Sequence, residues 1–349
     1  MNNIIAKDLD FILNSGIDWE KFRNKTVLIT GAYGMLLSYI AYTLLRLNEI
    51  DPKFNVTVIA LIRDKEKAKK RFGYFIESKH LRLFIHDLSS PIKIDNDIDY
   101  IVHGASYASP HYFGANPIGI LLPNVIGTYH LLELAKSKEI EGFLFFSSGA
   151  VYGKPIAGEE VTEKDYGYLD PLDIMSCYGE SKRMGENMCK CWSQQFGIPF
   201  KIVRPAHIYG PTMDIEKDSR VFANFINNIV KGQNIVMRSD GTAKRSFCYI
   251  ADATVACLKV FLDGVDGEAY NIGNDAAYVS IGKLAEICVS TFPEKQLQII
   301  TEKRENAGGG ENKGDRMLMS SKKAEKLGWK CTFTIQEGLK RTVESFLQG

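Results

Sequence analysis

Short apolar runs alternate with amphipathic, helix-like segments between residues 25 and 210, and this rhythm constrains the fold more than any other feature. The runs are nearly continuous in apolar residues, which is typical of parallel strands whose sheet is covered on both faces. Strands separated by helices predict an α/β fold with a doubly wound parallel sheet. The strands are expected at 25–31, 55–63, 81–88, 98–106, 142–153 and 199–210. The helices are expected at 35–49, 64–78, 124–139 and 177–197.

The rhythm also divides the chain into parts. Residues 1–24 are expected to form an N-terminal helical extension on the outside of the main domain, which spans 25–210. Residues 211–349 contain shorter, irregular elements and predict a smaller mixed α/β lobe, from which a segment at about 245–262 returns to the main domain. The Gly-rich stretch 307–314 is most simply a flexible loop, with an active-site flap as the alternative.

Composition argues against several classes of function. The 349 residues carry 43 basic and 42 acidic side chains, so the net charge of +1 does not indicate the basic surface that nucleic acids require. No apolar run reaches the roughly 18 residues that span a bilayer, and no secretory leader is expected, so we expect no membrane partner. Seven cysteines without a C-x-x-C pair favour reduced thiols in a cytoplasmic protein, and we expect no metal site.

The turn after the first predicted strand has the glycine spacing of a dinucleotide site. Gly31 and Gly34 stand where the chain would turn tightly and let its backbone approach a pyrophosphate at a helix N-terminus. A third glycine normally allows the helix to pack closely on the sheet, but this chain has Leu37 there. The helix must therefore shift or direct that side chain elsewhere.

The end of the second strand bears on the choice of cofactor. An acidic residue there suits the ribose hydroxyls of NAD, whereas an arginine can accommodate the 2′-phosphate of NADP. Ile62 stands at the aligned position, Arg63 follows, and Asp64 is one residue further on. The sequence favours NADP and leaves NAD possible.

Tyr178 and Lys182 lie four residues apart on a predicted helix, so that their side chains share one face. A lysine ammonium close to a tyrosine favours the phenolate and lowers a pKa that is otherwise near 10. Ser148 stands at the end of the preceding strand, where ligands bind in doubly wound sheets. Its hydroxyl is placed to hydrogen-bond the same substrate oxygen as the tyrosine.

With these residues the chain resembles the extended short-chain dehydrogenase/reductase family, and within it the NAD(P)-dependent nucleotide-sugar epimerases, dehydratases and reductases. The resemblance covers nearly the whole chain, and its strength lies in the order of many short motifs. These are TGAYG, HDL, IVHGAS, NVIGT, SSGAVYG, YGESK, RPAHIYGP, RSFCYIAD, EAYNIGN and KLGW. The resemblance implies a Rossmann-type domain with a C-terminal lobe that holds a nucleoside diphosphate sugar.

The resemblance also implies roles for individual residues. Tyr178 would act as general acid or base, Lys182 as its partner, and Ser148 would orient the sugar oxygen. The implied cofactor-binding residues are Gly31, Tyr33, Gly34, Met35, Arg63, Asp87, Leu88, Ala105, Ser106, Tyr178, Lys182 and Pro205, with Asn124 shaping the pocket. The implied substrate-binding residues are Ser148, Gly149, His207, Arg245 and Arg304, with Arg316 as an alternative to Arg304. A guanidinium such as that of Arg245 suits diphosphate oxygens.

Two departures from the family pattern narrow the reaction. Dehydratases of this family carry an Asp-Glu pair after the serine, and the sugar-acid decarboxylases carry a glutamate, whereas this chain has Gly149 and Ala150. The sequence therefore favours a 4-epimerase or a 4-keto-sugar reductase, with a dehydratase or a UDP-glucuronate decarboxylase-like enzyme as the alternative. A non-catalytic NADP-binding regulator is an alternative of another class. His207 stands where the family often has asparagine.

The family commonly dimerises through the helix that bears the tyrosine, so a homodimer is expected. Met184, Met188 and Trp192 would face the partner, although packing within one chain explains them equally well.

Overall fold

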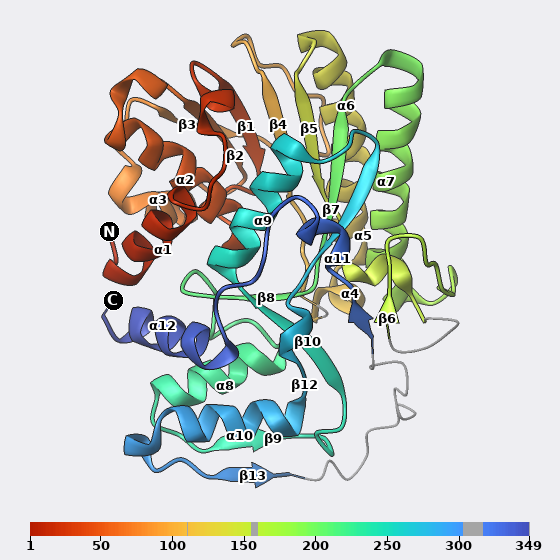
Figure 1. Cartoon of the computed structure of the whole chain (residues 1–349). Helices are drawn as coiled ribbons and strands as arrows, with labels where there is room; N and C mark the ends of the chain where they lie inside the picture. The colour runs from red at the N-terminus through yellow and green to blue at the C-terminus, as the bar shows by residue number, and fades with distance from the viewer. Residues whose placement is uncertain (110, 155–159, 303–316, 349) are drawn as a thin grey trace.

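A seven-stranded parallel sheet forms the centre of the molecule in the computed structural model, which describes residues 1–109, 111–154, 160–302 and 317–348 (Figure 1). The strand order is β11-β7-β5-β4-β1-β2-β3, and every neighbouring pair is parallel. The strands are β1 (Thr26–Thr30), β2 (Thr57–Ile62), β3 (Leu81–Ile85), β4 (Tyr100–His103), β5 (Gly142–Phe146), β7 (Phe200–Pro205) and β11 (Glu268–Ile272). The α/β fold and the doubly wound sheet predicted from the sequence are confirmed.

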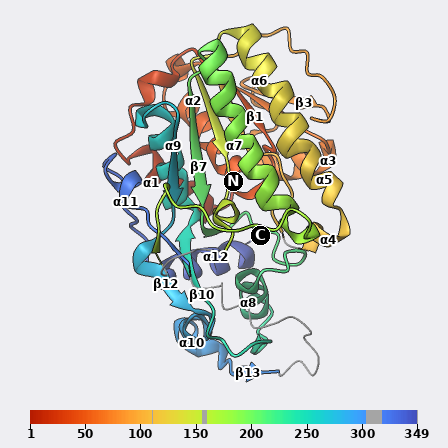
Figure 2. The same cartoon turned by 90° about the vertical axis from the view of Figure 1, so that its right-hand side faces the viewer.

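Helices cover both faces of this sheet, which explains why its strands are apolar throughout. Helices α2 and α9 pack on one face, and α6 and α7 pack on the other, which Figure 2 shows from the side of α6 and α7. Helix α3 lies beside β3 at the edge. The helices are α2 (Met35–Ile50), α3 (Lys65–Phe72), α6 (Gly127–Lys138), α7 (Cys177–Phe196) and α9 (Ile250–Asp263).

Helix α6 continues the short helix α5 (Pro117–Leu121) through a π-helical turn at Leu122–Ile126. The combined stretch Pro117–Lys138 is long and apolar enough to cross a membrane by length and composition alone. Buried helices of globular proteins pass the same test, and 44% of its most apolar window is buried against the rest of the chain. The expectation that no apolar run is long enough to span a bilayer therefore needs correction for this stretch, in which two glycines and several polar residues are interspersed.

The N-terminal helix α1 (Asn3–Leu13) is more firmly integrated than an external extension. It packs against α2, α9 and the C-terminal helix α12 (Ile335–Leu347), and the two termini lie close together in Figure 1. Asp8 is fully buried at this junction, where its carboxylate accepts hydrogen bonds from Tyr39, Tyr249 and Arg341. A buried carboxylate with three donors joins four parts of the chain that are distant in sequence.

The C-terminal lobe contains the short elements that the broken rhythm predicts. Helices α8, α10 and α12 pack together below the sheet, with a small sheet of order β12-β10-β8 beside them (Figure 1). Its elements are β8 (His207–Tyr209), α8 (Val221–Val230), β9 (Ile235–Met237), β10 (Lys244–Tyr249), β12 (Tyr278–Ser280), α10 (Ile281–Thr291) and β13 (Ile299–Thr301). Two short strands, β6 (Glu160–Val161) and β14 (Leu318–Met319), pair with each other, and α11 (Lys322–Glu325) follows.

The segment that returns to the main domain is longer than the expected 245–262. Helix α9 covers the sheet, and β11 then joins the sheet as an edge strand beside β7, so that the return extends to Ile272. Sequence periodicity alone could not assign this strand, because a five-residue run suits either sheet.

Candidate active site

The turn between β1 and α2 has an open backbone at the place where a pyrophosphate would bind. Gly31 has a φ of +65°, and a β-carbon there would lie 2.8 Å from the Cα of Ala105. Gly34 immediately precedes α2, and no side chain caps this helix N-terminus. Its first N–H groups are therefore available to an anion.

Leu37 packs against a glycine on the neighbouring loop, which leaves room for its side chain. A β-carbon at Gly104, just after β4, would lie only 2.6 Å from a methyl carbon of Leu37. In this contact the bulky residue lies on helix α2, and the glycine lies on the loop after β4. This contact explains how the turn keeps its close packing without the third glycine.

The ends of β2 and β3 form an exposed cofactor edge, defined here by Arg63, Asp87 and Leu88. The Arg63 guanidinium lies over the Tyr107 ring, 4.8 Å from its centroid. Hydrogen bonds from Ser89 lower the pKa of Asp87, and the nearby charge of Arg63 adds to this effect. Leu88 is buried, whereas Arg63 and Asp87 are exposed to solvent.

Two buried polar atoms beside this region have no hydrogen-bond partner among the described residues. They are the Oγ of Ser106, which lines the cavity, and the Oδ1 of Asn124, whose amide nitrogen donates to Ser181 at 3.0 Å. Buried polar groups are rarely left unpaired in native proteins. A polar ligand in the cavity would satisfy Ser106, and this supports a fit with a dinucleotide.

A cavity of about 1510 Å³ lies between the sheet domain and the C-terminal lobe. It brings together most of the residues that the sequence singles out. Those that line it are Tyr33, Gly34, Met35, Ser106, Ser148, Gly149, Tyr178, Lys182, Pro205, His207 and Arg245. Gly31 and Ala105 contact each other beside it, and the cofactor edge lies at the ends of the neighbouring strands. Arg304, Arg316 and the Gly-rich stretch 307–314 lie outside the described residues.

Tyr178 and Ser148 stand together at the carboxyl end of β5. Burial raises the pKa of Tyr178, while a hydrogen bond with Ser148 and the charge of Arg220 oppose this shift. The ring of Phe113 stacks on that of Tyr178, with centroids 5.0 Å apart and planes 19° apart. Tyr178 is only 7% exposed, so its hydroxyl works in a largely water-excluded place.

Lys182 lies one helical turn beyond Tyr178 and is almost completely buried, at 2% exposure. Its Nζ donates to the carbonyl oxygen of Phe146 at 2.7 Å and lies 5.9 Å from the Tyr178 ring centroid. Burial lowers the pKa of Lys182 to about 7, against the opposing effect of the Glu186 carboxylate. Its protonation therefore depends on its charged neighbours near neutral pH.

Glu186 and Arg204 are functional candidates that the sequence analysis missed. Arg204 is 1% exposed and binds Glu186 through two hydrogen bonds of 2.9 and 2.6 Å. Glu186 also accepts a hydrogen bond from Ser147, the residue before Ser148. Together with Ser148, Tyr178 and Lys182, these residues form what we term the catalytic wall. The signals were present: Glu186 follows Lys182 by four residues, and Arg204 interrupts an apolar strand.

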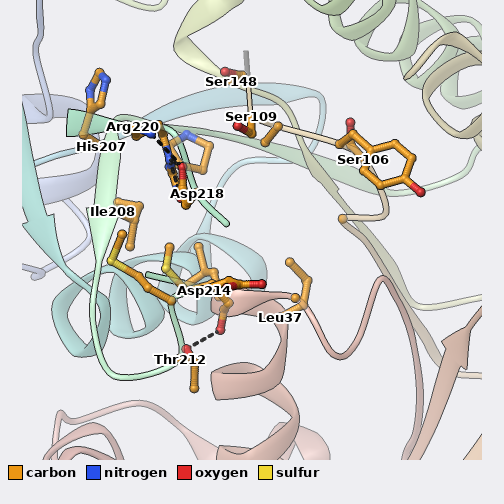
Figure 3. Close-up of a pocket in the computed structure, with 18 of the residues that line it drawn as sticks. Leu37, Ser106, Ser109, Ser148, His207, Ile208, Thr212, Asp214, Asp218 and Arg220 are labelled. Carbon is orange, nitrogen blue, oxygen red and sulfur yellow. Dashed lines mark hydrogen bonds and ion pairs between the residues drawn. The ribbon is translucent and has the colours of Figure 1, made fainter. Parts of the chain in front are cut away.

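The opposite side of the cavity carries His207, Arg245 and a second missed group. Arg220 pairs with Asp218 through its Nε, at 2.8 Å from Oδ2, and Figure 3 shows this pair among the residues that line the cavity, together with His207 and Ser148. Burial, with the charges of Arg245 and Arg220, lowers the pKa of His207 to about 3. A pKa this low favours the neutral imidazole at neutral pH. Arg245 lies half-buried on β10.

Two methionines occupy the place beside Gly149 and Ala150. A β-carbon at Gly149 would overlap the sulfur of Met319 and would lie 3.8 Å from the terminal methyl of Met317. Neither methionine was singled out from the sequence, because the contact joins segments about 170 positions apart. Gly149 and Ala150 bring no carboxylate to this side of the cavity.

Comparison with known proteins agrees with this geometry. The family model described as "NAD dependent epimerase/dehydratase family" matches residues 27–273. The chain belongs to this family. It is 31% identical over 327 residues to UDP-glucuronic acid decarboxylase 6 of Arabidopsis thaliana, covering 93% of this chain and 89% of that protein. It is 32% identical, with the same coverage, to UDP-glucuronic acid decarboxylase 3 of that plant.

Solved structures of family members share the fold. The UDP-glucose 4-epimerase of Thermotoga maritima, solved with UDP-glucose, superposes with a TM-score of 0.77 at 22% identity, covering 93% of this chain and 99% of that one. The UDP-glucuronic acid 4-epimerase of Bacillus cereus, solved with UDP-glucuronic acid and NAD, gives 0.76 at 22% identity with the same coverage. The decarboxylase relatives have names that match one alternative left open by the sequence, and the epimerases have names that match another.

The residues present fit a nicotinamide dinucleotide. Its pyrophosphate would lie at the open turn of Gly31 and Gly34 and at the uncapped end of α2. Ser106, and Lys182 of the catalytic wall, would bind other polar groups of the cofactor. A bound nicotinamide supplies reversible two-electron oxidation and reduction. Beside it, Tyr178 and Ser148 would bind one substrate oxygen, and Tyr178 would hold or accept its proton. Among the described residues, no group of three or more His, Cys, Asp or Glu side chains is arranged to hold a metal ion.

Proposed function

We propose that this protein acts on a nucleoside diphosphate sugar at its 4-position, as a 4-epimerase or a 4-keto-sugar reductase. The observation that carries the proposal is that Ser148 and Tyr178 line one cavity together with the buried Lys182, at a place where Gly149 and Ala150 bring no carboxylate. Binding and orienting one sugar oxygen and moving its proton is all that either reaction asks of these side chains.

A UDP-glucuronate decarboxylase-like activity is the second candidate, and the names of the relatives at 31% and 32% identity favour it. The two candidates make different demands on the substrate. Decarboxylation requires a sugar with a 6-carboxylate, whereas epimerisation or reduction at the 4-position does not.

The test is an assay of the purified protein against uridine, thymidine, cytidine and guanosine diphosphate sugars with each cofactor. Formation of a 4-epimer or consumption of reduced cofactor supports the proposal, while release of CO₂ from UDP-glucuronate establishes the second candidate. Absence of sugar turnover, together with retained cofactor binding, would favour a non-catalytic regulator.

For the cofactor we propose NADP, with NAD as the alternative. Arg63 supports NADP, because it is an exposed guanidinium at the end of β2, held over Tyr107 at 4.8 Å. The neighbouring Asp87 carboxylate weighs on the side of NAD, as does the NAD in the B. cereus epimerase structure. Mass spectrometry of the cofactor carried by the purified protein distinguishes the two.

We also propose that the protein is a homodimer and that the exposed face of the α5–α6 stretch forms its interface. The alternative for this face is contact with a membrane. Apolar side chains recur along the stretch at helical spacing, and Met184 of α7 is 49% exposed. They are Ile118, Leu121, Leu122, Ile126 and Tyr129. Sedimentation should show a dimer that Ile118→Glu converts to monomer, while Leu172→Glu, at a residue 94% exposed in a different segment, has no effect. Flotation of the unaltered protein with lipid vesicles would contradict the choice.

A further inference from the structure

An apolar wall lies next to the catalytic residues, built by Gly149, Ala150, Ala206, Met317 and Met319. All five line the same cavity as Ser148 and Tyr178. They come from the turn after β5, the turn after β7, and the strand β14 with the residue before it. The wall is therefore assembled by three separate segments around one part of the cavity.

Packing holds this wall in place. Met319 is 4% exposed and belongs to a small apolar cluster with Val151, Tyr152 and Val161, against which Ala206 and Met317 pack. The pairing of β14 with β6 sets Met319 opposite Val161. Since a β-carbon at Gly149 would overlap the Met319 sulfur, the methionine occupies the space that any longer side chain there would need.

Two backbone N–H groups at and beside this wall already have partners. The N–H of Ala150 donates to the Ser148 hydroxyl at 3.2 Å, and the N–H of Val151 donates to the Ser148 carbonyl at 3.2 Å. The five residues of the wall have no side-chain hydrogen-bond donor, and their only side-chain heteroatoms are two thioether sulfurs. A hydroxyl or carboxylate that contacts this wall would lose its hydrating water and gain no hydrogen bond from the side chains of the wall. For a hydroxyl this loss costs on the order of 1–3 kcal/mol.

The position of the wall identifies the part of the sugar that meets it. Gly149 and Ala150 directly follow Ser148 and line the same cavity, so a sugar whose reacting oxygen lies at Ser148 and Tyr178 would place a substituent of a neighbouring carbon against the wall. In a hexopyranose that reacts at C4, the neighbours are C3, which carries a hydroxyl, and C5, which carries C6. An apolar wall suits C6 only if C6 is a methyl group.

The cations nearest the catalytic wall are already engaged by other groups. Arg220 directs its Nε to Asp218 at 2.8 Å, and Lys182 donates to the Phe146 carbonyl oxygen at 2.7 Å. A sugar with a 6-carboxylate would therefore have to share either cation with a group that the cation already binds.

We propose that the substrate is a nucleoside diphosphate 6-deoxyhexose, whose 6-methyl group packs on Ala150, Met317 and Met319. This inference rests on the proposed function and adds the identity of the C6 substituent. It separates this chain from enzymes of uronic acids, although the relatives with the highest identity quoted above carry that name.

The test offers three sugars matched in nucleotide base: a 6-deoxyhexose, the corresponding hexose and the corresponding hexuronate. The protein loaded with oxidised cofactor is assayed for reduction of that cofactor and for formation of altered sugar, and kcat/KM is compared within each base. The 6-deoxy sugar should exceed the hexose by about 10- to 200-fold, the range for one small group in an apolar pocket, with the uronate lower still.

Equal or better turnover of the hexose or the hexuronate overturns the 6-deoxy inference and leaves the proposed function standing. No turnover of any sugar on any base overturns the proposed function, and the inference with it.

A pair of variants at Met317 tests whether the wall itself sets the preference. Met317 is partly exposed, so a substitution there places little demand on folding. Met317→Gln introduces an amide of similar length and should reduce the 6-deoxy to hexose ratio about tenfold, whereas Met317→Leu should keep it. The same ratio in both variants would show that the wall does not contact C6.

Discussion

The catalytic wall and the cofactor edge lie at the same end of one sheet but differ in burial. In the catalytic wall, Lys182 and Arg204 are 2% and 1% exposed, and their hydrogen-bond partners come from neighbouring elements. At the cofactor edge, Arg63 and Asp87 face solvent. Removing one partner of a buried ion pair lowers the free energy of unfolding strongly. Changing an exposed charge, which solvent and salt screen, has a small effect. The comparison indicates that the residues proposed for the reaction are held by packing, whereas the residues proposed to choose the cofactor are surface charges with few constraints.

The largest effect is expected at the centre of the catalytic wall. Tyr178→Phe removes the proton-bearing oxygen and should lower kcat by about 10²- to 10⁴-fold, with cofactor binding nearly intact. Turnover assays and cofactor titration measure the two quantities separately. Unchanged turnover would remove Tyr178 from the catalytic assignment.

Glu186→Gln tests whether the buried ion pair of Glu186 and Arg204 contributes more to stability than a pair closer to the surface. Loss of one partner leaves Arg204 buried without its counter-charge, so the free energy of unfolding should fall by about 3 kcal/mol. The partly exposed pair of Glu180 and Arg183, 3.6 Å apart on the same helix, provides the control, because Glu180→Gln should cost less than about 1 kcal/mol. Denaturant unfolding of both variants gives the comparison, and equal losses would contradict it.

The same variant has a consequence for pH dependence. Burial lowers the pKa of Lys182 to about 7 and Glu186 opposes that shift, so removing the Glu186 charge lowers the pKa further. If protonated Lys182 supports the Tyr178 phenolate, activity should decline at a lower pH in Glu186→Gln than in the unaltered protein. Coincident pH profiles of kcat would show that Glu186 does not act through Lys182.

Gly31→Ala probes the boundary between the two regions. A positive φ costs a side-chain residue on the order of 1–3 kcal/mol, and the added carbon would also press on Ala105 at 2.8 Å. Gly16 is the matched control, because it has a φ of +73° with nothing within 4 Å. The Gly31 variant should be the less stable of the two and should alone lose cofactor affinity. Equal stability and unchanged cofactor binding would mean that the close approach to Ala105 is unimportant.

The smallest effect is expected at the cofactor edge. Arg63→Ala should reduce the preference for NADP over NAD by about tenfold, through the dissociation constant of NADP, because one exposed guanidinium is lost. Arg82, exposed on β3, provides a control of equal charge. Equal weakening of both cofactors would remove the basis for choosing NADP.

Much of the fold could be predicted from the sequence because its signals are local. The six apolar runs from 25–31 to 199–210 contain the central strands β1, β2, β3, β4, β5 and β7, and the last run also contains β8 of the smaller sheet. Helix α7 begins and ends within one residue of its expected range. The helical spacing of Tyr178 and Lys182 is likewise a property of neighbouring residues. The strand β11 was assigned to the wrong part because its five residues fit either sheet, and only pairing with β7 decides between them.

The sequence by itself determined the alternation of strands and helices, the glycine turn at Gly31 and Gly34, and the Ser148, Tyr178 and Lys182 set. Only the tertiary structure decided which distant residues pack against them or against their neighbours. Leu37 is tolerated because Gly104 faces it, and Arg204 is tolerated in a buried strand because Glu186 binds it. Met319 fills the space at Gly149 from a distant strand. Such contacts depend on which distant segments pack together in the fold. Local patterns of polar and apolar residues do not predict that packing.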